Sequence, residues 1–336
     1  MRMITMTRGL LALSALLSAI APANAAADGL KAHKVKDGKV MYSHGADPHT
    51  AALTRQDAYV NVTPDAPVCV SSTERRTLVV YVHPTDVPNN YGSAAGTIRS
   101  SVNLANGKLV QEGRDRWRDA AWLYSTWPEM TVQCAGGVTE VGYVALTSHS
   151  SELTQADAFT KISTQVQQAY GGMSGTNPRR YLVYVDAPVS GYCGQGSVFN
   201  DDRLSTANPH YVYGGLVAAV YQPCWSGSTA LHEFLHNAGA VQLSAPHSSG
   251  AYHCTDGLDV MCYADGGPQS GGYSEAICTL SVPIDCGRDD YFDARRSSLV
   301  GSYLATHWNV GNTTYNRWLR KISRKDCQQV ELCVEA

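Results

Sequence analysis

The stretch His232-Glu233-Phe234-Leu235-His236-Asn237-Ala238-Gly239 is the most informative part of this chain. Residues four apart on an α-helix lie one turn from each other on the same face, so the imidazoles of His232 and His236 can reach a single Zn²⁺ ion. Glu233 then projects beside that ion, where a carboxylate can take a proton from a water molecule. The stretch therefore predicts a zinc helix with Glu233 as general base.

The rest of the same stretch predicts that the helix ends at Gly239. Gly239 stands where a helix commonly stops in left-handed backbone, which glycine adopts without strain. The alternative is a core helix that carries two histidines by chance, and it leaves the positions of Glu233 and Gly239 unexplained. The opposite face has apolar residues at helical spacing that would pack into a core, namely Leu231, Phe234, Leu235 and Ala238.

The N-terminus resembles an export signal. Arg2 and Arg8 precede an apolar run over residues 10–20, and Ala23-Asn24-Ala25 has the small-x-small pattern of a signal-peptidase site. The competing interpretation is a membrane anchor, but the apolar run is shorter than the ~20 residues that span a bilayer. Residues 1–25 are therefore expected to be a signal peptide, and the mature protein is expected to be secreted, extracellular and without a membrane span.

The chain has 10 cysteines, all after the predicted signal peptide. An even number in an exported chain predicts a framework of disulfide bonds. None forms a C-x-x-C motif, which disfavours a cysteine zinc site. Sequence cannot determine the pairing, but partners close in sequence are one option: Cys254 with Cys262, Cys278 with Cys286, and Cys327 with Cys333.

Composition limits the classes of partner. The 336 residues carry a formal net charge of −3, with both signs mixed along the chain. A basic patch of the kind that binds nucleic acid is missing from the sequence, so nucleic-acid binding has no support. We expect a monomer with a substantial core.

Periodicity predicts an α/β (α+β) fold. Residues 26–67 are polar and read as an N-terminal extension or a short pro-segment. Residues 68–330 are expected to form one domain, with an upper lobe over 68–239 and a loop-built, cysteine-rich lower lobe over 240–330. Predicted strands cover residues 77–82, 141–146 and 180–185, with an edge strand and its neighbour over 211–221, and predicted helices cover 97–109, 153–170 and 302–324.

The chain resembles the metzincin zinc endopeptidases. The first signature is H-E-x-x-H-x-x-G, and the second is Asp259-Val260-Met261-Cys262-Tyr263, which is similar to the Met-turn of that clan. The resemblance extends loosely to secreted reprolysin-like and snapalysin-like peptidases of bacteria. It implies a twisted, mostly parallel sheet with helices in the N-terminal lobe, and an irregular disulfide-rich C-terminal lobe that carries the Met-turn beneath the metal.

The resemblance also gives Tyr263 a role. In the astacin-like and serralysin-like branches a tyrosine stands two residues after the methionine, and Tyr263 has that position relative to Met261. Its phenol would point at the metal or at the developing oxyanion. The alternatives are a buried methionine and an interface tyrosine, both of which are common.

The third zinc ligand departs from the family pattern. Metzincins continue with G-x-x-H or G-x-x-D, whereas this chain has Gln242, whose amide oxygen is a poor zinc ligand. His247 is the preferred third ligand, because it follows the turn and Pro246 keeps its approach extended. His253 comes next, and Gln242 or a carboxylate such as Glu275 remains an alternative.

A cluster of four aspartates over residues 285–293 could in principle bind Ca²⁺. Hard oxygen ligands suit Ca²⁺, but the spacing of these residues matches no known calcium loop. A Ca²⁺ site is therefore unsupported, and a solvated acidic turn is expected. The residues are Asp285, Asp289, Asp290 and Asp293.

These observations predict a secreted zinc-dependent endopeptidase acting on protein or peptide substrates. His232, His236 and His247 would hold Zn²⁺, with Glu233 as general base and Tyr263 helping to stabilise the oxyanion. One alternative is a secreted zinc-binding protein with weak or no peptidase activity. Another is a disulfide-stabilised surface adhesin whose metal is structural, and a closed site with both His247 and His253 bound would favour either alternative.

Overall fold

The computed structural model describes residues 31–34, 39–43, 62–115, 126–174, 177–274, 283–294 and 300–323. The predicted signal peptide lies outside these ranges. So do Glu275 and three cysteines, Cys278, Cys327 and Cys333.

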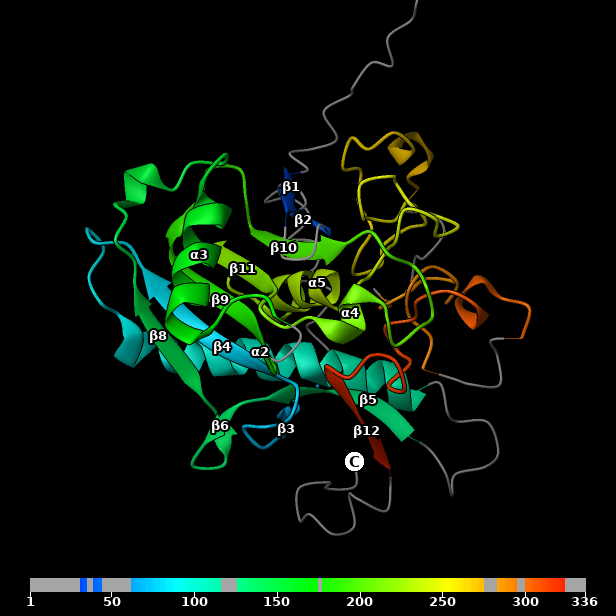
Figure 1. Cartoon of the computed structure of the whole chain (residues 1–336), viewed down its shortest axis with the longest axis horizontal. Coiled ribbons are helices and arrows are strands. Elements are labelled where there is room, and N and C mark those ends of the chain that lie inside the picture. The colour runs from blue at the N-terminus through cyan, green and yellow to red at the C-terminus, as the bar shows by residue number, and fades with distance from the viewer. Residues whose placement is uncertain are drawn as a thin grey trace, which may run out of the picture.

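A mixed β-sheet runs through the centre of the molecule (Figure 1). Its middle strands are parallel: β8 (Val141–Ala145), β4 (Arg76–His83), β9 (Arg179–Pro188) and β11 (Val217–Gln222). Every residue of β4 is buried, as the dense apolar and β-branched sequence predicts for a parallel strand covered on both faces. The strands predicted over 77–82, 141–146 and 180–185 are confirmed.

Two groups of shorter strands extend the sheet. On the β4 side lie β5 (Thr126–Val132), with β3 (Val68–Cys69) parallel to it and β12 (Leu319–Ser323) antiparallel to it. On the β11 side, β10 (Gly194–Phe199) is antiparallel to β11. Next to β10 lies β2 (Val40–Ser43), and then β1 (Lys31–Lys34), both antiparallel to their neighbours. A separate two-stranded sheet joins β6 (Cys134–Ala135) to β7 (Val138–Thr139).

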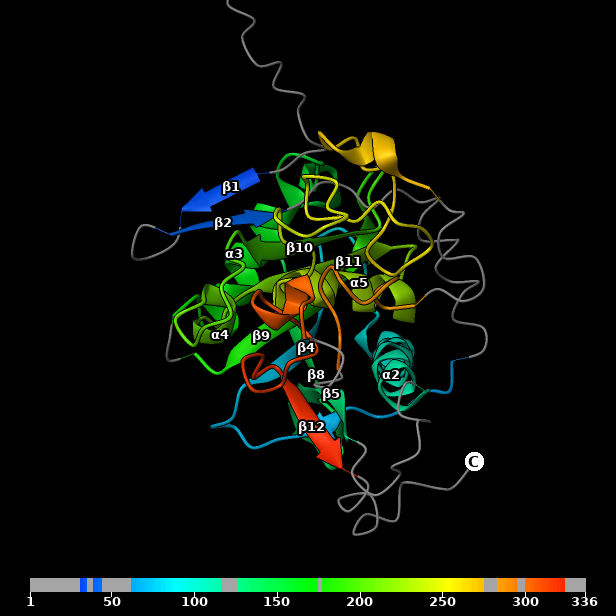
Figure 2. The same ribbon diagram turned by 90° about the vertical axis from the view of Figure 1, so that its right-hand side faces the viewer.

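Helices cover both faces of the sheet (Figure 2). Alternate side chains of β4, such as Val79 and Tyr81, pack with helices α2 (Tyr91–Asp115) and α5 (Gly227–Ala238). Their neighbours Val80 and Val82 pack on the other face with α3 (Ala158–Tyr170). The two cores follow from the period-2 alternation of strand side chains. The other helices among the described residues are short: α4 (Pro209–Val212) and the 3₁₀ turns η3 (Ser150–Glu152), η4 (Ser270–Gly272) and η5 (Tyr303–Ala305).

The segment after α5 is irregular, as predicted. The described residues between 240 and 302 form turns, bends, isolated bridges and η4. The helix predicted over 302–324 is wrong, because only η5 and β12 form there. Gly311 and Asn312 lie in the turns between η5 and β12. The backbone of β12 hydrogen-bonds to β5, so it does not make the internal hydrogen bonds of a helix.

Three disulfides join described residues: Cys69–Cys134, Cys193–Cys224 and Cys254–Cys262. The sequence-near pairing of Cys254 with Cys262 is confirmed. Cys286 is also disulfide-bonded, with its partner outside the described residues. Among the described residues, no helix combines the length and apolar character that crossing a bilayer requires.

Candidate metal centre

Helix α5 has clear start and stop signals. The Ser226 hydroxyl accepts a hydrogen bond from the N–H of Thr229 (3.1 Å), which caps the first turn. Gly239 ends the helix in left-handed backbone, with φ of 94°. A Cβ at Gly239 would lie 2.6 Å from Nε1 of Trp308, so both backbone angle and space require glycine. The predicted helix and its predicted end are confirmed.

Three histidine side chains converge at the metal centre. They are His232 and His236 of α5, and His253 from the irregular segment, and all three are buried. Nε2 of His236 lies 3.0 Å from Nε2 of His232 and 3.2 Å from Nε2 of His253. Three ring nitrogens therefore face one point.

In His232 and His253, the hydrogen bond made by Nδ1 determines whether Nε2 carries a proton or a lone pair. Nδ1 of His232 lies 2.7 Å from the carbonyl oxygen of Val260, which can only accept, so Nδ1 carries the proton and donates. Nδ1 of His253 likewise donates to Oδ2 of Asp265, 2.9 Å away. Nε2 of each neutral ring then presents a lone pair to the centre of the cluster.

This arrangement fits a tetrahedral zinc site. Zn–N distances of about 2.0–2.1 Å put the nitrogens of a tetrahedral site about 3.3 Å apart, close to the separations here. A direct hydrogen bond can satisfy only one of the two Nε2 contacts of His236, whereas a cation satisfies all three nitrogens at once. The donor set is therefore suited to one divalent metal ion.

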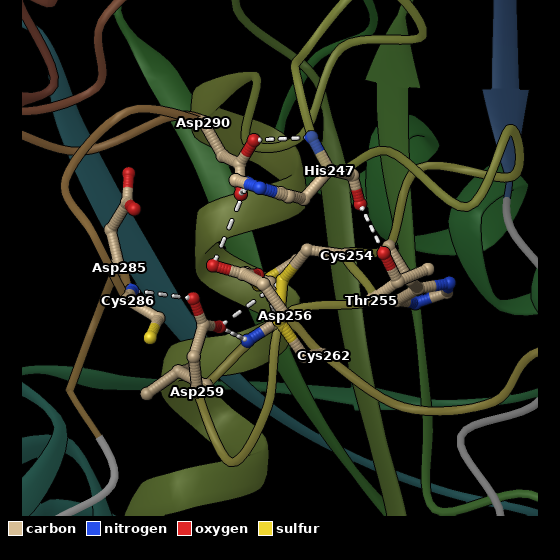
Figure 3. The surroundings of a disulfide bond; sticks show 12 residues. His247, Cys254, Thr255, Asp256, Asp259, Cys262, Asp285, Cys286 and Asp290 are labelled. Carbon is tan, nitrogen blue, oxygen red and sulfur yellow. Dashed lines mark hydrogen bonds and ion pairs between the residues drawn. A yellow bond between two sulfur atoms is a disulfide. The ribbon is translucent and has the colours of Figure 1, made fainter. Parts of the chain in front are cut away.

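The loop that carries Met261 is tightly held around Asp259 and the Cys254–Cys262 disulfide (Figure 3). Met261 is fully buried, and its N–H donates to Oδ1 of Asp259 (2.5 Å), while the N–H of Cys286 donates to Oδ2 (3.1 Å). Burial, and then the charge of Asp285, raise the pKa of Asp259 well above its ordinary value. The Cys254–Cys262 disulfide links the residue after His253 to this turn.

Tyr263 lies against the histidines. Its ring centroid is 4.3 Å from that of His253 and 6.2 Å from that of His232, and the residue is 5% exposed. The structure thus brings Tyr263, predicted from its place after Met261, to the edge of the histidine cluster.

Glu233 is fully buried on the same helix and lies under strand β10. A Cβ at Gly194 would lie 2.1 Å from Oε1 of Glu233, and a Cβ at Gly196 would lie 2.7 Å from Cβ of His236. Glycine at both positions lets the strand pass directly over the metal centre. The sequence analysis did not single out these residues, although the Gly-x-Gly spacing at 194–196 is the signal that marks them.

The hydrogen bonds of Gln242 are made outside the cluster of His232, His236 and His253. Its Nε2 donates to the carbonyl oxygen of Gly239 (3.0 Å), and its Oε1 accepts from the N–H of Asp201 (2.9 Å). Both contacts stabilise the turn after α5. Gln242 therefore has a structural role in the position where metzincins carry their third ligand.

The preference for His247 over His253 needs correction. The chain turns between the two residues, with the N–H of Ser249 donating to the carbonyl oxygen of His253 (2.7 Å), and only His253 returns to the helix. The N–H of His247 donates to Oδ1 of Asp290 (2.8 Å), and its Nδ1 lies 3.2 Å from Oδ2 of the same residue (Figure 3). His247 is thus held in a separate acidic group with Asp256, Asp289 and Asp290.

Three of the four aspartates over residues 285–293, namely Asp285, Asp290 and Asp293, are buried, so the expected solvated turn is wrong. Asp285 and Asp290 are 0% and 1% exposed, and the carboxyl groups of Asp256 and Asp290 hydrogen-bond each other (Figure 3). Burial, followed by the charge of Asp256, raises the pKa of Asp290 to about 8. His247 and backbone N–H groups supply the other hydrogen bonds, so we base no calcium site on this group.

Comparisons with known proteins give little further information. No family model and no curated protein matches the chain. A solved structure of a chaperone–substrate complex is 16% identical with a TM-score of 0.27, over 50% of this chain and 24% of that one. The chain thus spans about a quarter of that structure's length. Metalloproteinase-II from Bacteroides fragilis is 13% identical with a TM-score of 0.28, over 70% of this chain and 69% of that one. Likenesses this weak carry no argument, so the candidate site rests on its own geometry.

Proposed function

We propose that the protein is a secreted zinc-dependent endopeptidase of the metzincin type. The observation that carries the proposal is the convergence of three Nε2 atoms, from His232, His236 and His253, two of them on the helix that also carries Glu233. Three neutral imidazole nitrogens are one of the ligand sets found in catalytic zinc sites, which keep a fourth position for water or substrate. The separation of His247 from this cluster supports an open fourth position over a closed structural site.

The residues of the centre have distinct chemical roles in this proposal. Bound there, Zn²⁺ would polarise the scissile carbonyl and lower the pKa of a water molecule toward ~7. Glu233 accepts the proton of the attacking water and passes it to the departing amine. The phenol of Tyr263, next to His253, donates to the developing oxyanion.

The N-terminal region supports a precursor form. Strand β2 pairs with the outer edge of β10, with Ser43 opposite Ser197 and Met41 opposite Phe199. β10 is also the strand that passes over Glu233. We propose that residues 26–67 are a short pro-segment, with residues 68–330 as the metallopeptidase domain.

Zinc content and proteolysis test the function together. The purified mature protein should contain about one zinc per chain, cleave an unfolded protein substrate and lose that cleavage when a chelator removes the metal. Added zinc should restore cleavage. Folded protein without zinc would overturn the proposal, and zinc-loaded protein without cleavage would favour a binding protein or an adhesin with a structural metal.

A further inference from the structure

A polar cavity of about 580 Å³ lies between the start of β4, the segment before β9 and strand β12. Four basic side chains line it: Arg75, Arg317, Arg320 and Lys321. Glu74 is the acidic residue of the lining, and its carboxylate already accepts a hydrogen bond from the N–H of Ser71 (3.0 Å). The walls therefore carry a marked excess of positive charge.

Aromatic rings and neutral acceptors hold two of the arginines. The half-buried guanidinium of Arg75 lies 5.3 Å from the ring of Trp318 and donates to the carbonyl oxygen of Val212 (3.0 Å). The guanidinium of Arg317 lies 5.2 Å from the ring of Tyr211 and donates to its hydroxyl (3.0 Å). Cation–π contacts orient both groups without neutralising them.

Glu74 is the one carboxylate of the lining, and hydrogen bonds from Ser71, followed by the charge of Arg320, lower its pKa, so a single acidic group faces four basic ones. Within the part of the chain that the structure describes, none of the four basic residues is in an ion pair. Burial lowers the pKa of Arg75, and the nearby positive charge of Arg317 lowers it further. Two like charges held together lose free energy that a bound anion would recover.

Arg180, on the inner side of Trp318, shows the contrast. Its buried guanidinium lies 4.0 Å from the Trp318 ring and donates to the carbonyl oxygen of Asn237 (2.5 Å), near the C-terminus of α5. That carbonyl lies at the negative end of the α5 dipole, which favours a positive charge, and Arg180 has no place in the cavity lining. Arg75 and Arg317, by contrast, line the cavity.

We propose that this cavity binds a small molecule carrying a phosphate or sulfate group. A tetrahedral oxyanion offers several oxygens to two guanidinium groups at once, and planar guanidinium groups match that geometry. The volume is that of a small-molecule site. The site is separate from the metal centre, so it does not depend on the proposed peptidase function.

Calorimetric titration of the full-length mature protein tests the site. Inorganic phosphate and inorganic sulfate are titrated separately, with chloride keeping the ionic strength constant at about 0.1 M. Saturable binding of either ion supports the site, and the preferred ion identifies the ester. No saturable binding of either ion would overturn it.

Variants locate the binding. Arg317 and Arg320 are exposed, so Arg317→Gln and Arg320→Gln should fold normally, and together they should weaken binding about tenfold or more. Arg203→Gln is the matched control, because Arg203 is an exposed arginine already paired with Asp201. Equal loss in the control, or no loss in the double variant, would show that binding lies elsewhere and would refute the proposal.

Discussion

Nδ1 of His253 lies 2.9 Å from Oδ2 of Asp265, and both side chains are buried. Burial alone would raise the pKa of Asp265, but hydrogen bonds from His253 and Ser249 outweigh it and lower the pKa. An ionised Asp265 holds the Nδ1 proton of His253 and turns Nε2 toward the α5 histidines. The position of the third ring nitrogen thus depends on a carboxylate twelve residues away in sequence.

Asp265→Asn should weaken zinc binding without abolishing it. Loss of the group that orients a histidine ligand typically costs roughly 10–100-fold in metal affinity. Competition with a zinc chelator gives the affinity of wild type and variant. Asp186→Asn is the control, because Asp186 accepts hydrogen bonds from Tyr81 and Asn90 instead of from a metal-centre histidine. Unchanged affinity in the Asp265 variant would mean that its carboxylate does not orient His253.

Replacing the third histidine itself should have a larger effect. His253→Ala removes one of three convergent nitrogens, so we expect zinc to leave readily on dialysis against a chelator. His247→Ala and Gln242→Ala should keep zinc, because His247 contacts Asp290 and Gln242 contacts the backbone of Gly239. If His247→Ala released the metal and His253→Ala retained it, the ligand assignment proposed above would be reversed.

Glu233→Gln separates metal binding from catalysis. Glutamine keeps the size of the side chain and leaves all three imidazoles, so zinc content should match wild type. Proteolysis should fall by two or more orders of magnitude, roughly the contribution of general base catalysis. Zinc analysis and a cleavage assay on the same preparation provide the test. Wild-type cleavage by this variant would exclude Glu233 as the base.

Gly194→Ala tests the close passage of β10 over Glu233. The added Cβ would lie 2.1 Å from Oε1 of Glu233, so the carboxylate must move. We expect lower cleavage with zinc retained, since a displacement of about 1 Å can cost 10²-fold in rate. Gly96→Ala in α2 is the matched control, because its Cβ would meet no atom within 4 Å. Equal activity in both variants would show that Glu233 tolerates the shift.

Local sequence patterns were sufficient for strands β4, β8 and β9 and for helix α5, whereas β11, expected at an edge, is a central strand. Dense apolar runs such as 77–82 bury both faces of a strand, and Gly239 ends α5 as its conformational freedom predicts. The burial of these strands and the end of α5 are determined mainly by the residues of each segment itself. Their boundaries consequently lie within a few residues of the predicted ones.

The third histidine could not be predicted in the same way. His247 and His253 stand on one loop, and contacts with residues outside their own segments decide between them. Asp290 draws His247 away, while Asp265 and the Cys254–Cys262 disulfide bring His253 back. Strand β10 was missed because Gly194 and Gly196 lower its strand propensity. Glycine is needed at both positions because α5 packs so closely against this strand that a Cβ would clash with it.

The buried carboxyl group of Asp290 should give the protein a stability that falls with rising pH. Its folded-state pKa of about 8 is raised by burial and by Asp256. An unfolded aspartate titrates near ~3.9. Between these values the folded state holds a proton that the unfolded state has lost. The stability contributed by Asp290 is therefore greatest below the unfolded pKa and decreases by up to about 1.4 kcal/mol per pH unit as the pH rises toward the folded pKa.

Asp290→Asn should flatten this dependence. Urea unfolding of wild type and variant at about pH 5 and about pH 7.5 measures the free energy of unfolding on both sides of neutrality. Asp86→Asn is the control, because the Ser150 hydroxyl lowers the pKa of that exposed carboxyl and both states are ionised across this range. If the free energy of unfolding fell as steeply with pH in Asp290→Asn as in wild type, Asp290 would lose its proton at ordinary acidic pH. The proton of Asp290 would then not be what joins the carboxyl groups of Asp256 and Asp290.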